Sequence, residues 1–230
     1  MTDVPNTALI TGASRGIGRA TALRLGGSHH IVAVARSASE LETLAAEIEA
    51  KGGTCETIVL DVADASAVAT ALDGVHADVL INNAGVGYLK PFLELTPDEW
   101  HTMVDVNFNA LFHVTRALLP GMVERGRGHI VMVGSIAGRS AFVGGNCYAA
   151  TKHAVMGFSE SLMLEVRDKG VKVSVVNPGS VATTFSRRER DTSWMITAED
   201  VAEAIAHAID TPPRVLIHRI EVRAAVPKKG

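Results

Sequence analysis

The chain has 230 residues, 47% of them hydrophobic, which is enough to bury one large core and fits a single domain over residues 1–230. Its formal net charge is −3, and its basic clusters are confined to residues 187–190 and 228–229, so nucleic acid is not expected as a partner. No run of about 18 apolar residues is present in the sequence, so no membrane-spanning segment is expected.

The first residues and the two cysteines bear on the location of the protein. Residues 1–5 lack the basic and apolar parts of a signal peptide. Cys55 and Cys147 are too few and too far apart to suggest a framework of disulfides, and a reducing cytoplasm fits them best. The histidines show no metal-ligand spacing, so we expect no metal site.

The first predicted elements are a short buried strand over residues 7–11 and a helix over residues 15–26. Between them lies a glycine loop in which Gly12, Gly16 and Gly18 have the spacing G-x-x-x-G-x-G. Gly12 permits a tight turn, and the other two glycines let the backbone approach a pyrophosphate and the helix pack close to the strand. This order of elements predicts a dinucleotide site at the helix N-terminus, with a purely structural loop as the alternative.

The second predicted strand, near residues 30–35, ends at Arg36 with no carboxylate there, and a helix is expected near 39–50. An NAD pocket usually presents Asp or Glu to the ribose 2′-hydroxyl, whereas an arginine suits the 2′-phosphate of NADP. Arg15 in the glycine loop is placed to converge on the same phosphate. The two guanidinium groups therefore favour NADP(H), with NAD(H) possible and with two solvated loop arginines as the alternative.

The rest of the chain continues to alternate strands rich in Val, Ile, Leu and Ala with helices. This alternation predicts an α/β fold in which a doubly wound, Rossmann-like parallel sheet of about seven strands has helices on both faces. Ligands bind such sheets at the carboxyl ends of the strands. The further strands are expected near residues 54–60, 77–81, 128–134, 171–176 and 214–222, and the further helices near 64–72, 97–123, 148–169 and 198–209.

Tyr148 and Lys152 stand four residues apart, and this spacing puts both side chains on one face of a helix. An ammonium group beside a phenol favours the phenolate, so the pKa of Tyr148 is expected to fall from about 10 toward the working pH. A tyrosine of that kind gives or takes a proton during catalysis. An ordinary surface pair is the alternative, and the dinucleotide motif upstream favours the catalytic interpretation.

These motifs, with Asn82–Gly85, Ser135 and Asn177–Gly179, resemble those of the short-chain dehydrogenase/reductase family. The resemblance covers nearly the whole chain, in order and at the family's usual intervals. The length and the glycine spacing are similar to those of the compact, single-domain branch. The extended, sugar-modifying branch has a sizeable C-terminal region that this chain lacks.

The resemblance implies four catalytic residues. Tyr148 is implied as the acid/base, and Lys152 as the residue that lowers its pKa and binds the nicotinamide ribose. Ser135 is implied to hold the substrate carbonyl, and Asn107 to anchor a water for proton relay. These roles also suit hydride transfer to a ketone, because the negative charge that develops on oxygen needs a donor and a proton source.

The resemblance also implies a cofactor site drawn from the glycine loop and from the ends of the strands. Asp61 and Val62 are implied to contact the adenine, Asn83 to Gly85 the middle of the cofactor, and Pro178 to Thr183 the nicotinamide. The complete expected set is Gly12, Ser14, Arg15, Gly16, Ile17, Gly18, Arg36, Asp61, Val62, Asn83, Ala84, Gly85, Tyr148, Lys152, Pro178, Gly179, Val181 and Thr183.

The expected activity is NADP(H)-dependent interconversion of a carbonyl and a secondary alcohol on a small molecule. A catalytically silent NADP(H)-binding sensor or scaffold is the alternative, and the length disfavours a dehydratase or epimerase. Substrate choice is expected to depend on residues 87–89, 141–143 and 185–195. Residues 217–222 resemble the last strand of serine- or hydroxy-acid-type relatives. Relatives pair through the elements that match the helices near 97–123 and 148–169, so the resemblance also implies a homodimer or homotetramer.

Overall fold

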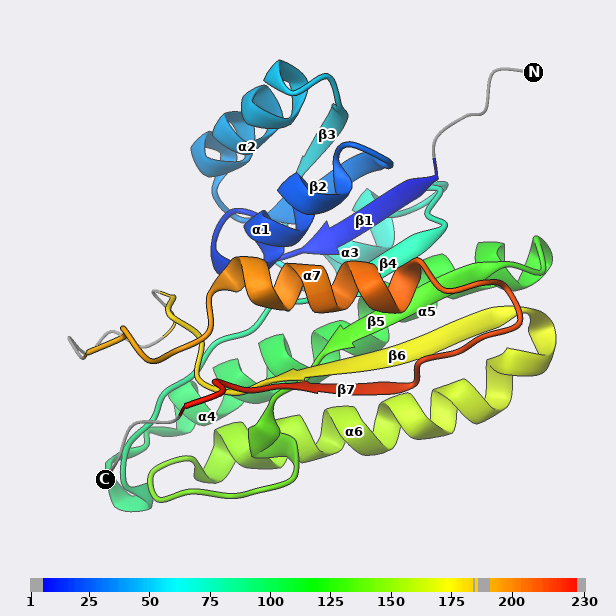
Figure 1. Ribbon diagram of the computed structural model, residues 1–230. Helices are drawn as coiled ribbons and strands as arrows, with labels where there is room; N and C mark the ends of the chain where they lie inside the picture. The colour runs from blue at the N-terminus through cyan, green and yellow to red at the C-terminus, as the bar shows by residue number, and fades with distance from the viewer. Residues whose placement is uncertain (1–5, 184, 186–190, 227–230) are drawn as a thin grey trace.

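The computed structural model describes residues 6–183, 185 and 191–226. The strands in this part of the chain are β1 (Thr7–Thr11), β2 (His30–Ala35), β3 (Thr54–Val59), β4 (Val79–Asn82), β5 (Gly128–Val133), β6 (Val171–Pro178) and β7 (Arg219–Val222). They form one seven-stranded sheet in the order β3-β2-β1-β4-β5-β6-β7, and every pairing is parallel. The predicted doubly wound parallel sheet is confirmed (Figure 1).

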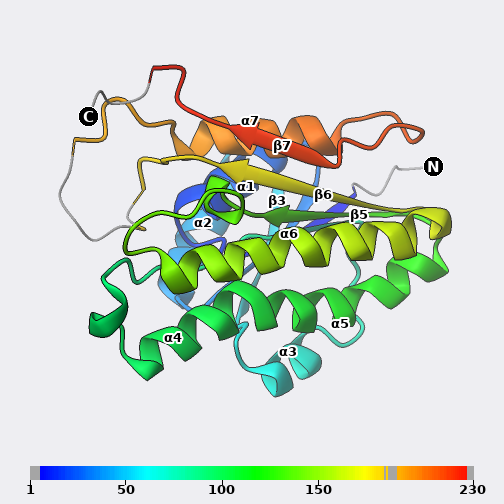
Figure 2. The same ribbon diagram turned by 90° about the horizontal axis from the view of Figure 1, so that it is seen from below.

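Helices cover both faces of this sheet. They are α1 (Gly16–Leu25), α2 (Ala38–Ala50), α3 (Ala65–Ala71), α4 (Pro97–Val104), α5 (Ala110–Glu124), α6 (Asn146–Val166) and α7 (Ala198–Ile209). Helices α1, α2 and α7 lie on one face, and α3 to α6 lie on the other, as Figure 2 shows. Each face has its own apolar cluster, with Leu44 and Ile205 in the first and Val68 and Leu118 in the second.

Local sequence explains where several helices begin. Thr96 caps α4 and Thr197 caps α7, each in a capping box in which an acidic residue three positions later bonds back to the threonine backbone. Ser37 caps α2 through its hydroxyl. Gly170, with a φ of 79°, ends the short turn that follows α6.

The single helix expected over residues 97–123 is interrupted. Helices α4 and α5 are separated by a π-helical turn at Asp105–Asn109. Asn107 in this turn accepts the N–H of Val86 at 2.8 Å and donates to the Val86 carbonyl at 2.9 Å. A π turn inserts an extra residue into the helix, and the helical period in the sequence does not reveal it.

The last predicted strand, over residues 214–222, is too long, because only Arg219–Val222 pairs with β6. The N–H of Val215 donates to the carbonyl of Pro212 at 2.8 Å and closes a turn there, so the extended segment starts later. The other predicted elements agree with the structure to within about three residues at each end, and the largest difference is that α6 ends at Val166 and a 3₁₀ turn follows it.

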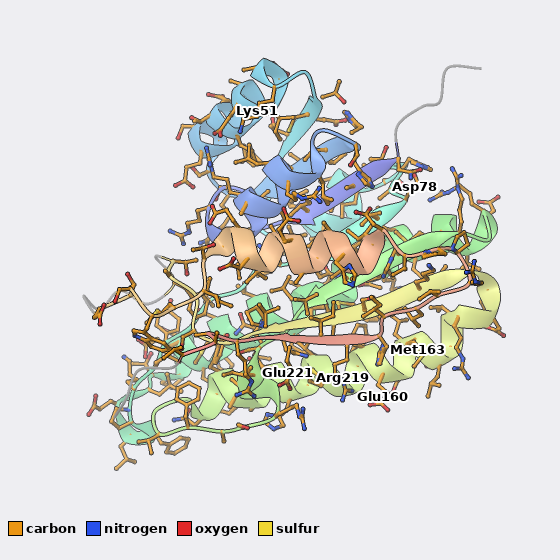
Figure 3. All side chains as sticks on the ribbon, viewed as in Figure 1. Lys51, Asp78, Glu160, Met163, Arg219 and Glu221 are labelled. Carbon is orange, nitrogen blue, oxygen red and sulfur yellow. The ribbon has the colours of Figure 1, made fainter. Side chains whose placement is uncertain are left out.

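The edge strand β7 is joined to the helix beneath it. Arg219 of β7 and Glu160 of α6 form an ion pair of 3.4 Å, and both side chains are labelled in Figure 3. Across the described residues, none of the helices has the length and apolar character needed to cross a membrane.

Candidate active site

The glycine loop lies at the carboxyl end of β1, beside the end of β4. These two strands are neighbours although two other strands separate them in sequence, so the loop sits at the point where the strand order reverses. Gly12 and Gly16 have φ values of 66° and 55°, in the left-handed region that favours glycine. A Cβ at Gly12 would lie 2.9 Å from the Cα of Ala84, so a side chain has no room there.

Asn83 ties the glycine loop to β4. Its Nδ2 donates to the carbonyls of Thr11 at 2.9 Å and of Gly12 at 3.2 Å. In return, the Oγ1 of Thr11 accepts the N–H groups of Asn83 at 3.0 Å and Ala84 at 3.1 Å. The two segments expected at the cofactor's pyrophosphate are therefore held together by four hydrogen bonds.

The N-terminus of α1 is suited to an anion. Within the described structure, Arg15 at its N-cap makes no side-chain capping bond and the first turn carries no acidic residue, unlike the capped α2, α4 and α7. Its first backbone N–H groups are thus available to phosphate oxygens. Ser14 is half-buried beside this end, and Ile17 packs against the core and orients the helix.

Arg36 and Asp61 face each other at the ends of β2 and β3. Their closest side-chain atoms are 3.7 Å apart, and 65% of the arginine side chain is exposed. A contact this long and exposed holds the guanidinium loosely, so it remains available to a 2′-phosphate. Val62 beside them is buried in the apolar core. The residues of this corner fit NADP(H).

Ser135 lies two residues after the end of β5 and is buried. Its Oγ accepts the N–H of Ala137 at 3.1 Å, which caps a short 3₁₀ turn over Ile136–Gly138. Because that bond uses an acceptor site, the hydroxyl proton is still available for donation. The Ser135 hydroxyl lies close enough to the Tyr148 phenol to lower the pKa of that phenol, so the structure brings these two predicted residues together.

The proton affinity of Tyr148 differs from the sequence-based expectation. Burial raises the pKa of the phenol above its usual value, and the nearby Ser135 hydroxyl lowers it only in part. Lys152 does not reverse this, because its Nζ lies 5.9 Å from the centre of the ring and donates to the Val133 carbonyl at 2.9 Å. The expectation that Lys152 brings the phenol toward neutral pH is therefore wrong for the chain in this form.

Lys152 and Asn107 converge on Gly85. A Cβ on Gly85 would lie 3.4 Å from Asn107 Oδ1 and 4.0 Å from Lys152 Nζ. Asn107 also donates to the hydroxyl of Thr151, the residue before Lys152, at 3.2 Å. Burial lowers the pKa of Lys152 to about 8, so its ammonium still carries a charge at neutral pH. All four predicted catalytic residues thus gather at the ends of β4 and β5.

The segment after β6 runs along the same edge. The N–H of Gly179 donates to Val222 at 2.8 Å, Pro178 ends the strand, and Val181 forms an isolated bridge with Ile196. The methyl group of Thr183 would lie 3.5 Å from a Cβ on Gly16, which brings this segment to the glycine loop.

Phe185 is the described part of the predicted substrate segment that reaches the site. Its ring lies 5.6 Å from that of Tyr148, centre to centre, and lies against Gly87. Met195, in the same predicted segment, is buried in the core, whereas Arg187, Arg188 and Arg190 lie outside the described residues.

Three residues of the site received no role from the sequence: Thr11, Thr151 and Asn177, the last of which was recognised only as part of a motif. Each acts through a hydrogen bond to a residue that a motif did identify. Their positions beside the motifs were visible, but threonine and asparagine are common in turns and carry no signal alone.

Known proteins are similar to this chain in both sequence and fold. Residues 6–194 match the family described as short chain dehydrogenase. The NADP-dependent 3-hydroxy acid dehydrogenase YdfG of Salmonella typhi is 35% identical, with 93% of each chain covered. The closed form of serine dehydrogenase complexed with NADP+ aligns with a TM-score of 0.91 at 33% identity, over 97% of this chain and 96% of that one.

A third relative is more distant in sequence. An alcohol dehydrogenase from the archaeon Thermococcus sibiricus, complexed with 5-hydroxy-NADP, aligns with a TM-score of 0.90 at 28% identity, over 98% of this chain and 99% of that one. The family match spans most of the chain, and the motifs stand in the geometry just described. The chain belongs to the short-chain dehydrogenase family.

Proposed function

We propose that this protein is an NADP(H)-dependent oxidoreductase, built as one domain, that interconverts a carbonyl and a secondary alcohol. The observation that carries the proposal is the gathering of Asn107, Ser135, Tyr148 and Lys152 beside the glycine loop at one edge of the sheet. A silent sensor or scaffold would have no need to keep a buried cation and two hydroxyl donors at this place.

In the reducing direction, Ser135 and Tyr148 receive the substrate carbonyl oxygen. The nicotinamide, when bound, supplies the hydride that reaches the carbonyl carbon. Ser135 donates a hydrogen bond to the oxygen as negative charge develops, and Tyr148 transfers its proton to it. The raised pKa of Tyr148 keeps the phenol protonated at neutral pH, which suits it as the acid in reduction.

Lys152 and Asn107 support this proton transfer. Lys152 carries a positive charge at neutral pH and would stabilise the phenolate that Tyr148 leaves behind. It would also bind the nicotinamide ribose, and its present hydrogen bond to the Val133 carbonyl would then weaken. Asn107, fixed between Val86 and Thr151, would position a water for reprotonation.

The remaining predicted residues would hold the cofactor. Arg15 and Arg36 would pair with the 2′-phosphate, while Asp61 and Val62 would contact the adenine. Two relatives are NADP-dependent or NADP-bound by name, which supports this preference over NAD. The segment from Pro178 to Thr183 would face the nicotinamide.

The names of the relatives favour a small hydroxy acid as substrate. One relative is named for 3-hydroxy acids and another for serine. Residues 217–222, part of which forms β7, resemble the same kinds of relative in sequence. We therefore propose a hydroxy acid with its hydroxyl on a secondary carbon, or the aldehyde-forming oxidation of serine, as the first substrates to test.

A homodimer or homotetramer in the cytoplasm is also proposed. Phe112 on α5 and Leu164 on α6 are each more than half exposed, and burial of such side chains in an interface would stabilise an oligomer. The two free cysteines fit a reducing compartment. Light scattering on the purified protein tests the assembly, and a monomer mass would contradict it.

Replacing Tyr148 by Phe tests the proposed activity. Loss of the acid/base is expected to lower kcat about 10²- to 10⁴-fold, whereas NADPH affinity stays nearly unchanged. The measurement is NADP+ reduction with L-serine and 3-hydroxy acids, together with NADPH binding followed by fluorescence. Retained turnover in the variant would refute the role of Tyr148, and a wild-type protein that binds NADPH but converts no ketone or alcohol in a broad panel would favour the sensor.

A further inference from the structure

Asn177 lies next to the proposed catalytic hydroxyl without being part of any role so far described. It stands near the carboxyl end of β6, which pairs with β5 (Figure 1), and its side chain is fully buried. Its Oδ1 accepts the backbone N–H of Ser135 at 3.1 Å. The bond crosses 42 residues of sequence and joins the ends of two neighbouring strands.

The backbone around this bond is shaped to admit it. Gly134, the residue before Ser135, has no side chain, and a Cβ there would collide with the Oδ1 of Asn177. The N–H of Gly134 is already paired with the Val176 carbonyl at 2.8 Å. The backbone pairing between the two strands ends at Gly134, one residue before Ser135. The buried N–H of Ser135 therefore relies on the Asn177 side chain for its hydrogen bond.

The other half of the Asn177 amide is unpaired. Among the described residues, its buried Nδ2 has no hydrogen-bond partner. An unpaired buried donor destabilises a fold, and an apolar residue of the same size would avoid that cost. The presence of an asparagine here is therefore explained by its side-chain oxygen, which accepts the N–H of Ser135.

We propose that Asn177 is a positioning residue, which holds the backbone of Ser135 so that its hydroxyl stays within reach of Tyr148 and of the substrate oxygen. This inference rests on the proposed function. Ser135 adopts an extended conformation, with φ −171° and ψ 157°, and its carbonyl and Oγ are both engaged in the 3₁₀ turn that follows. With its N–H released, the start of that turn would lose its fixed place relative to α6.

The test is a double-mutant cycle between Asn177 and Ser135. Asn177→Leu keeps the branched shape of the side chain but removes the acceptor, and it is expected to lower kcat about tenfold to a hundredfold with unchanged NADPH affinity. In the Ser135→Ala background the same substitution should cost less than about twofold, because the hydroxyl that Asn177 positions is already absent. Asn177→Asp retains the acceptor oxygen and should keep more of the wild-type kcat than the leucine variant.

Two outcomes would overturn the inference. One is a leucine variant with wild-type kcat, and the other is equal losses in the wild-type and Ser135→Ala backgrounds, as a general effect on folding would produce. Asn177→Ala is carried through the same cycle if the leucine variant does not fold. A wild-type protein without turnover on any substrate refutes the proposed function itself, and that result is read before any variant is compared.

Discussion

At the scale of single residues, the site is governed by burial. The phenol of Tyr148 and the ammonium of Lys152 are both shifted toward their neutral forms, since each loses water around its charge. The amine of Lys152 donates to the Val133 carbonyl at 2.9 Å and lies 5.9 Å from the centre of the Tyr148 ring. In the proposed reaction the cation therefore acts on a phenolate as it forms, whereas burial keeps the resting phenol protonated.

Cofactor choice is a residue-scale property that Arg36 allows us to test. Arg36→Asp is expected to lower kcat/KM for NADP+ about tenfold to a hundredfold, because a charge-assisted pair with the 2′-phosphate is replaced by repulsion. The kcat/KM for NAD+ should rise or stay unchanged. Steady-state kinetics with both cofactors measures the ratio. Arg116→Asp on α5 is the matched control for the change in charge. If the ratio of kcat/KM for NADP+ to kcat/KM for NAD+ is unchanged in Arg36→Asp, Arg36 does not determine the cofactor preference.

At the scale of elements, the active site depends on how closely the 3₁₀ turn after β5 approaches α6. A Cβ on Gly138 would lie 2.7 Å from the Lys152 carbonyl and 3.0 Å from the Cγ of Met156. The turn carries Ser135, and the helix carries Tyr148. Glycine at this one contact thus permits the close approach of the two groups that are proposed to share the substrate oxygen.

Gly138→Ala is therefore expected to separate the turn from α6. A displacement of about 1 Å between reacting groups costs up to about a hundredfold in rate, so a loss of roughly tenfold to a hundredfold in kcat is expected. Gly157→Ala, on the exposed side of the same helix with open space around it, is the control. It should keep kcat and gain up to about 1 kcal/mol in stability. Equal kcat values for the two variants would contradict the packing argument.

At the scale of the whole molecule, the two edges of the sheet serve different purposes. The carboxyl edge carries the proposed site, and the opposite edge, where Asp78 is labelled in Figure 3, carries a buried polar cluster. There the Nε2 of His129 lies 2.8 Å from the Oγ of Ser174, which donates its only proton to the Ile217 carbonyl at 2.6 Å. The histidine must then donate to the serine. Burial, and secondarily the charge of Lys172, lowers the pKa of His129 to about 4.

This histidine makes the fold sensitive to acid. The unfolded chain takes up a proton at His129 near pH 6.5 and the folded chain only near pH 4, so stability falls as the pH drops through this window. The full effect is about 3.5 kcal/mol, from about 1.4 kcal/mol for each pKa unit. Urea unfolding between about pH 7 and pH 4.5 measures it.

His129→Gln removes the titrating group and retains a donor for Ser174. Its stability should depend less on pH in this window than that of the wild type, while the exposed His101→Gln keeps the wild-type dependence. Parallel curves for His129→Gln and the wild type would show that other groups cause the loss in acid.

The sequence alone determined the order of the elements, the glycine loop and the family, because these depend on short-range patterns. Alternating apolar strands and helices, glycines at fixed spacing and a Tyr–Lys pair four residues apart are all visible within a few residues of one another. The same motifs named the four residues that the structure gathers at one edge. Helix and strand ends were predicted almost as well, except at the π turn of Asp105–Asn109 and before β7.

Only the tertiary structure decided what surrounds those residues. The pairing of Asn177 with Ser135 and of Asn107 with Val86 joins segments that are 42 and 21 positions apart, and no local pattern specifies such contacts. The pKa of Tyr148 likewise follows from burial by several elements at once rather than from its neighbour in the helix. Solvation and packing are properties of the assembled fold, so spacing along the chain identifies the reacting groups but not the environment that sets their chemistry.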